Sequence, residues 1–241
     1  MSHTNESAAP APRHPRFVRI THWLTTIAFF ALLLSGGEVL LSHPRFYWGE
    51  VGNANMTPLL VIPVPSSRST IPTGYSFNLP DQNGWSRSLH FQAAWLLLFV
   101  GLAYVLAGMR SGHFRRNLVP SPSDRSLGAL RHAIAEHLRF AATAVGDASS
   151  YNGLQRLSYL VVVFVLFPLI IWTGLAMAPG FTAVFSPAVS LLGGQQSART
   201  LHFVVTIALV LFTLVHLMMI VLAGFRARVL PMIAGTTEEN R

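Results

Sequence analysis

Histidine is the residue in this sequence whose positions best fit a chemical function, because it follows an arginine by three residues at the start of three apolar segments. The three motifs are RITHW at 19–23, RSLHF at 87–91 and RTLHF at 199–203. They place His22, His90 and His202, and a fourth histidine, His216, lies in the same apolar segment as His202. An ionisable side chain inside a membrane segment is unfavourable, so it is a functional-site hypothesis by default.

The elements that must position these histidines are long apolar segments. The chain has 241 residues, of which 51% are hydrophobic and 11% charged, whereas soluble domains carry roughly 25% charged residues. A membrane-spanning helix needs about 20 mostly apolar residues. Four segments meet this requirement: Ile20–Leu41, Leu89–Met109, Ser158–Met177 and Leu201–Gly224. The sequence therefore predicts an all-α integral membrane four-helix bundle, and we expect the first span to be retained, because its apolar core exceeds the roughly 7–15 residues of a signal peptide.

Arginine is the only strongly basic residue type, and its distribution predicts the orientation. Segments 1–19, 110–157 and 225–241 hold 13 of the 17 arginines. Since cytoplasmic segments are enriched in basic residues, both termini and the middle loop are expected in the cytoplasm of a bacterial inner membrane. Because the arginines follow the membrane, the net charge of +8 does not indicate nucleic acid. The lack of cysteine excludes disulfides and thiolate metal sites.

Four regions follow from this topology. Residues 1–19 are expected to form a cytoplasmic disordered N-terminus, 20–226 the di-haem membrane domain, and 227–241 a cytoplasmic tail. The outer loop 42–86 is rich in proline and aromatic residues and is expected to form an ordered cap or to be an insertion without a role. The cytoplasmic loop 110–157 contains apolar residues at helical spacing between 127 and 145, which predicts an amphipathic helix in the membrane surface.

Depth sorts the four histidines into two pairs. The first span runs outward and places His22 near the cytoplasmic side, whereas His90 and His202 begin inward spans on the outer side. His216 follows His202 by 14 residues, which is about 21 Å along a helix and close to four full turns, so both lie on one face. His90 with His202 and His22 with His216 would each supply two axial imidazoles to a haem b in the bundle core.

The arginines of the three motifs are expected to bind the same haems as the histidines. Each lies one helical turn nearer the water than its histidine, where it can bind a haem propionate. Arg87 and Arg199 are expected to serve the outer haem and Arg19 the inner one, and the alternative for them is contact with lipid headgroups. Hydrogen bonding across helices is the alternative for each histidine. Zinc is a further metal that binds imidazole, but it would normally need its ligands clustered at one depth, which two histidine pairs about 20 Å apart do not provide.

Glycine and proline in two of the spans indicate close packing. Gly36 and Gly37 in the first span and Gly174 in the third permit a neighbouring helix or a flat ring to approach closely. Pro168 in the third span can kink a membrane helix.

The pattern of one histidine on each of the first two spans, none on the third and two on the fourth resembles bacterial di-haem cytochrome b subunits. These are the membrane subunits of nickel–iron hydrogenases, formate dehydrogenases and thiosulfate-reductase-type molybdoenzymes. The motif RTLHF followed by LVHL, and FPLIIWTGLAMAP in the third span, carry the resemblance together with the other two motifs. It implies the ligands His22, His90, His202 and His216, and electron transfer between a partner enzyme and membrane quinone.

We therefore expect a membrane-anchor subunit that exchanges electrons between a periplasmic redox enzyme, with a molybdoenzyme favoured, and quinone. Two bis-histidine b haems are expected, with quinone as electron donor or acceptor near the inner one. One alternative is a self-contained haem b quinone oxidoreductase acting on a small oxidant or reductant such as superoxide. A second is a haem-free membrane anchor or transporter whose histidines are structural or relay protons.

Overall fold

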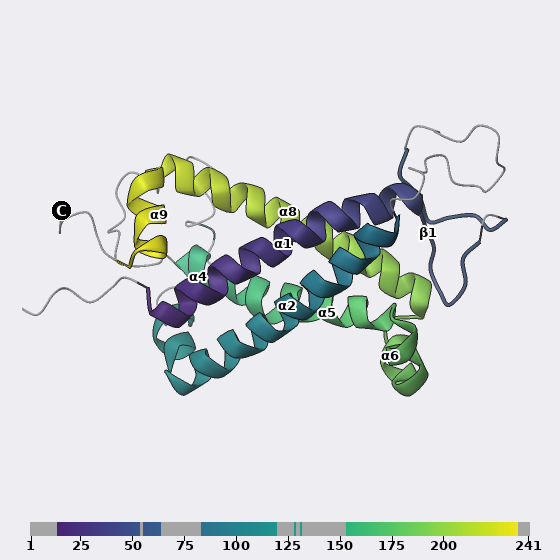
Figure 1. Cartoon of the computed structure of the whole chain (residues 1–241), viewed down its shortest axis with the longest axis horizontal. Helices are drawn as coiled ribbons and strands as arrows, with labels where there is room; N and C mark the ends of the chain where they lie inside the picture. Colours follow the sequence, from purple (N-terminus) through teal and green to yellow (C-terminus); the bar gives the residue numbers. More distant parts are fainter. Residues whose placement is uncertain are drawn as a thin grey trace, which may run out of the picture.

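The computed structural model describes residues 14–53, 55–63, 83–119, 128, 131 and 153–235, and helices dominate these residues. Four helical segments are long and apolar enough to cross a membrane, and they run along the long axis of the molecule (Figure 1). Their bounds are Arg16–Leu41, Gly84–Arg110, Arg156–Ala176 and Gln195–Leu222. The predicted all-α architecture and its four spans are therefore confirmed.

The four spans form two packed pairs. Helix α1 (Arg16–Ser42) packs along α2 (Asn83–Arg110). The third span consists of α4 (Gly153–Val161), the π-helical segment η4 (Val162–Leu166) and α5 (Phe167–Ala176), and α5 packs against α8 (Gln195–Leu222). The first and second spans form one pair and the third and fourth spans the other, so each pair consists of spans that are consecutive in the chain.

The π-helical segment η4 marks where Pro168 affects the third span. Proline has no N–H to donate to the carbonyl four residues earlier, and its ring crowds that carbonyl. The turns immediately before Pro168 widen into a π-helix over Val162–Leu166, and the helix then continues as α5. Local π adjustments of this kind are how membrane helices accommodate proline. The expected effect of Pro168 therefore takes the form of a widened segment.

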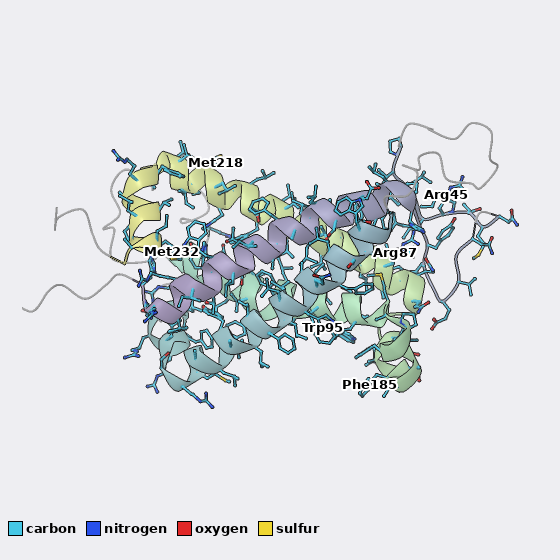
Figure 2. The ribbon with its side chains drawn as sticks, viewed as in Figure 1. Arg45, Arg87, Trp95, Phe185, Met218 and Met232 are labelled. Atoms are coloured by element: carbon cyan, nitrogen blue, oxygen red, sulfur yellow. The ribbon has the colours of Figure 1, made fainter. Side chains whose placement is uncertain are left out.

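The spans expose apolar surface along most of their length, which fits a lipid environment. Trp95 and Phe99 on α2 stack at a ring-centre distance of 5.7 Å, and both are more than half exposed. Trp95 lies along α2 between the two ends of the molecule (Figure 2). The buried apolar side chains are mostly small or branched, among them Ala176, Ala198 and Val205. Small side chains allow membrane helices to approach closely, since lipid tails are as apolar as the protein core.

The described part of the outer loop is an ordered cap. Strands β1 (Arg45–Phe46) and β2 (Leu60–Val61) form a short antiparallel ribbon in which Phe46 pairs with Leu60. Phe46 and Tyr47 are buried, and the Phe46 ring lies 4.5 Å from that of Phe203 on α8. Residues 64–82 of the predicted outer loop lie outside the described residues.

This cap binds the first turn of α8, where backbone N–H groups have no partner within the helix. The carbonyl of Gly49 accepts from the N–H groups of Gln196 and Ser197 at 2.9 and 3.2 Å. The Glu50 carboxylate accepts from the Gln195 N–H at 3.2 Å, and its negative charge suits the positive end of the helix dipole. The Gly49 N–H in turn donates to the Ser197 hydroxyl at 2.8 Å. We call these contacts between residues 49–50 and 195–197 the α8 clamp.

Shorter helices lie at the two ends of the bundle. Helices α6 (Pro179–Val184) and α7 (Ser186–Ser190) lie at the end that carries β1, while α9 (Phe225–Ile233) lies at the opposite end (Figure 1). The π-helical segment η1 (Phe114–Leu118) follows α2. Of the amphipathic helix predicted between 127 and 145, the structure describes Gly128 and Arg131, both helical, and the rest lies outside the described residues.

Helix α9 is tied to the start of α1. The Arg19 guanidinium donates to the Ile233 carbonyl and the Trp23 indole to the Met232 carbonyl, each at 3.1 Å. Cationic and N–H donors at the C-terminal end of a helix satisfy its free carbonyls. As a result, the first and last described residues of the chain lie at the same end of the bundle.

The α8 clamp depends on a glycine conformation that can be tested. Gly194, which precedes α8, has φ 104° and ψ 176°, and an added Cβ would lie 2.7 Å from the carbonyl carbon of Gly49. Backbone conformations of this kind are essentially restricted to glycine and cost other residues about 1–3 kcal/mol. Gly194→Ala should therefore lower the thermal unfolding midpoint of the purified protein in detergent. Gly101→Ala is the control, because nothing lies within 4 Å of its added Cβ. Equal midpoints for the two variants would contradict the role of the clamp.

Candidate functional site

The four histidines come from three helices, and the structure brings them together in two pairs. His90 on α2 faces His202 on α8 with a ring-centre distance of 6.3 Å and an interplanar angle of 59°. His22 on α1 faces His216 on α8 at 6.5 Å and 54°. The pairs are those expected from depth in the membrane. After the predicted orientation, we call His90 and His202 the outer pair and His22 and His216 the inner pair, and we name the two ends of the bundle accordingly.

The separation of the rings in each pair matches one metal ion held between two imidazoles. Two metal–imidazole bonds of about 2 Å each, plus the distance from each nitrogen to its ring centre, add up to about 6 Å. Within the part of the chain that the structure describes, no group of three or more histidine, cysteine, aspartate or glutamate side chains gathers around a common point. Each site thus offers two ligands, which is the number that supplies the axial positions of a haem iron.

The two pairs lie toward opposite ends of the bundle. The outer pair is near the end that carries β1, where Figure 2 shows Arg45 and Arg87. The inner pair is near α9, which carries Met232 at the opposite end in the same view. Aromatic rings line the inner pair. Trp23 lies edge-on to His22 at 5.3 Å, and Phe212 stacks on His216 at 5.8 Å with an angle of 14°. Such rings exclude water from the imidazoles.

Each histidine of the outer pair is bound by a hydroxyl group from the preceding span. The Ser35 hydroxyl on α1 lies 3.0 Å from Nδ1 of His90, and the Thr173 hydroxyl on α5 lies 3.0 Å from Nδ1 of His202. Both hydroxyl residues are fully buried. Neither residue belongs to the histidine motifs from which the site was predicted. A sequence pattern nevertheless marks both hydroxyl residues. Each directly precedes a glycine, and the next span along the chain begins with an RxLH motif.

The glycines after these hydroxyl residues lie against the same rings. A Cβ added to Gly36 would lie 3.3 Å from Cε1 of His90, and one added to Gly174 would lie 3.4 Å from Cε1 of His202. Nothing lies within 4 Å of a Cβ added to Gly37. Gly36 and Gly174 therefore permit the close approach of a flat ring, which here is an imidazole.

The three arginines of the motifs have different surroundings. Arg19 is bound to the Ile233 carbonyl at the inner end. Arg199 donates to the Arg45 carbonyl and lies over the Phe46 ring at 5.2 Å, so it is held by β1. Arg87 is exposed near the outer end. A guanidinium has five N–H donors, so these contacts leave capacity for a propionate, and propionate binding by the three arginines stays a prediction.

Two histidines outside the spans are neutral at physiological pH. Burial lowers the pKa of His43, which directly follows α1, and the positive charges of Arg199 and Arg87 lower it further. Burial likewise lowers the pKa of His113, with Arg116 as the second cause. Since a lowered pKa disfavours the protonated imidazole, neither side chain adds a positive charge at pH 7. The positive charge at the outer end therefore comes from the arginines.

Comparison with known proteins decides the family. The family model of the prokaryotic cytochromes b561 matches residues 13–235, which is nearly the whole chain. The chain belongs to the prokaryotic cytochrome b561 family. This cytochrome is 29% identical over 220 residues to a protein of Azospira oryzae that carries the name of a protein-methionine-sulfoxide reductase subunit, YedZ1, covering 87% of this chain and 90% of the relative. No solved structure matches the chain.

The family membership confirms the resemblance to bacterial cytochrome b membrane subunits. This cytochrome is a bacterial membrane protein that binds haem b and transfers electrons. The donor set fits that group, because imidazoles in facing pairs are the axial ligands that a b haem uses. The absence of a side chain at Gly36 and Gly174 leaves room for two of these imidazoles.

Gly36 and Gly37 provide a matched test of the outer pair. Gly36→Ala should displace the His90 ring and reduce the haem content of the purified cytochrome, because the added Cβ meets that ring. Gly37→Ala should retain the wild-type haem content, since alanine favours a helix and the space is open. Haem content is measured from reduced-minus-oxidised spectra of both variants. If Gly36→Ala binds as much haem as Gly37→Ala, the close approach is not required for haem binding.

Proposed function

We propose that this cytochrome binds two b haems, an outer one between His90 and His202 and an inner one between His22 and His216. The single observation that carries the proposal is the presence of two imidazole pairs with metal-compatible ring separations of 6.3 and 6.5 Å at opposite ends of one apolar bundle. The 14-residue spacing on α8 supports it, because both of its histidines lie on one helix face.

When bound, haem b supplies a one-electron carrier whose reduction potential depends on its ligands and surroundings. The residues of this chain hold, orient and shield that group. Neutral imidazoles provide the ligand lone pairs, and the hydroxyl groups of Ser35 and Thr173 orient two of them. Phe212 and Trp23 shield the inner pair from water. Two carriers at opposite ends of the bundle allow electrons to cross most of the membrane thickness.

The outer end is proposed to face a periplasmic redox enzyme and the inner end to lie near the quinone site. The arginine distribution supports this orientation, since it places both termini in the cytoplasm. The structure is consistent with both ends of the described chain lying on the same side of the membrane, because α9 is hydrogen-bonded to the start of α1. Quinone reaction near the inner pair follows the resemblance to formate dehydrogenase subunits.

The proposed partner is a periplasmic oxidoreductase, with a molybdoenzyme favoured by the resemblance. The name of the Azospira oryzae relative supports a partner that reduces methionine sulfoxide in proteins. In that case electrons pass from quinol through this subunit to the partner. The ordered cap of β1 and β2 contacts α8 at Thr200 and Phe203, on either side of His202, at the end where such a partner would exchange electrons.

Haem stoichiometry tests the two sites directly. The purified wild-type protein should contain two b haems per chain, whereas His90→Ala and His216→Ala should each retain about one. The double variant should contain none, because it lacks one ligand of each pair. A quantitative haem assay combined with reduced-minus-oxidised spectra provides these numbers, and circular dichroism controls for folding. One haem in the wild type, or none, would refute the proposed pair of sites.

The same variants locate the quinone site. A short-chain quinol added to the purified protein should still reduce the haem of His90→Ala, because that variant keeps the inner pair. The rate of haem reduction in His216→Ala should fall at least tenfold, since the remaining outer haem is far from the proposed quinone site. Stopped-flow absorbance measures both rates. The reverse order of the two variants would place quinone at the outer end.

A further inference from the structure

Each hydroxyl group beside the outer pair contacts both a backbone carbonyl of its own helix and a histidine ring. Ser35 Oγ donates its single proton to the Ala31 carbonyl at 2.7 Å, and Thr173 Oγ1 donates to the Leu169 carbonyl at 2.8 Å. A hydroxyl that has used its proton can only accept from a further neighbour. The contacts of 3.0 Å with the two rings are therefore donated by Nδ1–H of His90 and of His202.

This direction determines which nitrogen of each ring is available as a ligand. A neutral imidazole carries one proton, so a proton on Nδ1 leaves the lone pair on Nε2. The hydrogen bond made by the one ring nitrogen sets the tautomer and the orientation of the other. Both histidines of the outer pair are thus oriented before any metal binds, with Nε2 as the free donor.

In the inner pair, His22 differs from the histidines of the outer pair in this respect. Nδ1 of His22 is buried and has no hydrogen-bond partner among the described residues. Two threonine hydroxyls flank His22 on α1, but Thr21 donates to the Phe17 carbonyl at 2.7 Å and Thr26 to the His22 carbonyl at 2.9 Å. Since Nδ1 of His22 has no partner, neither of these hydroxyls accepts from it, and neither orients the ring in the way that Ser35 orients His90.

We propose that Ser35 and Thr173 are positioning residues for the outer haem and lower its reduction potential relative to that of the inner haem. This inference rests on the proposed function, because it assumes that the outer pair ligates haem. A hydrogen bond from Nδ1–H increases the basicity of the ligating nitrogen, and a more basic ligand stabilises the oxidised iron. The outer pair receives this effect from both of its ligands.

The arrangement occurs twice with the same geometry. On α1 and α2, Ser35 and Gly36 contact His90, and on α5 and α8, Thr173 and Gly174 contact His202. In each case the hydroxyl binds Nδ1 and the glycine leaves room for Cε1 of the same ring. The two ligands of the outer haem are therefore supported in the same way from two different pairs of helices.

The test uses variants that remove the hydroxyl and variants that keep it. Ser35→Ala and Thr173→Val remove it, while Ser35→Thr and Thr173→Ser keep it. Thr206→Val is the matched control, because the Thr206 hydroxyl lies on α8 and donates to the backbone carbonyl of His202 at 2.8 Å. Redox titration of the purified proteins measures the two haem potentials, and electron paramagnetic resonance reports the geometry of each oxidised haem.

We expect Ser35→Ala and Thr173→Val each to raise the potential of one haem, the same haem in both, and to leave the other unchanged. The hydroxyl-retaining variants and Thr206→Val should titrate like the wild type. Loss of that one haem in either hydroxyl-free variant, with retention in its hydroxyl-retaining counterpart, would also support positioning.

Two haems with unchanged potentials and unchanged resonance signals in Ser35→Ala and Thr173→Val would overturn this inference and leave the proposed function intact. A shift of equal size in Thr206→Val would overturn it as well, because that hydroxyl does not contact a ring. A wild-type protein without haem would instead refute the proposed function itself, so the two failures are distinguishable.

Discussion

The requirement that two imidazoles on one helix meet partners on two different helices governs the arrangement of the bundle. Helix α8 carries His202 and His216 on one face, about 21 Å apart along its axis. That face must therefore contact α2 near one end and α1 near the other, and the ring contacts at 6.3 and 6.5 Å show that it does. The crossing of α8 over the α1–α2 pair satisfies both contacts at once. The third span has no histidine and instead supports α8 from the side through α5.

The spans and the histidine pairs could be predicted from the sequence because both depend on regular helix geometry. Apolar length identifies a membrane helix, and a fixed rise per residue converts a spacing of 14 residues into a depth. The role of Ser35 and Thr173 could not be predicted in this way, because the rotation of α1 against α2 and of α5 against α8 determines which side chain meets a ring. Serine and threonine are common in membrane helices as donors to their own backbone carbonyls, so their presence alone indicates nothing about a neighbour.

For the arginines, the sequence motif predicted a uniform role, whereas the structure shows three different surroundings. One repeated spacing suggested one role for Arg19, Arg87 and Arg199, yet their surroundings differ. Arg19 binds the carbonyl end of α9, and Arg199 binds β1, because elements far away in the sequence fold back onto the two ends of the bundle. A spacing along one helix contains no information about such elements. Pro168 is similar, since the sequence indicated a disturbance of the third span but not that a π-helical segment would accommodate it.

The α8 clamp has a consequence for the order in which the protein assembles. Gly49 and Ser197 are 148 residues apart, and two membrane spans separate the first half of the clamp from the second. Residues 49–50 are synthesised early but have no partner until the fourth span has entered the membrane. Closing a loop of this length is entropically unfavourable, so the clamp is expected to form late, when packing of α8 against α5 has already brought the ends together. Because the clamp fixes the first turn of α8, two turns before His202, the outer site would be completed last during biogenesis.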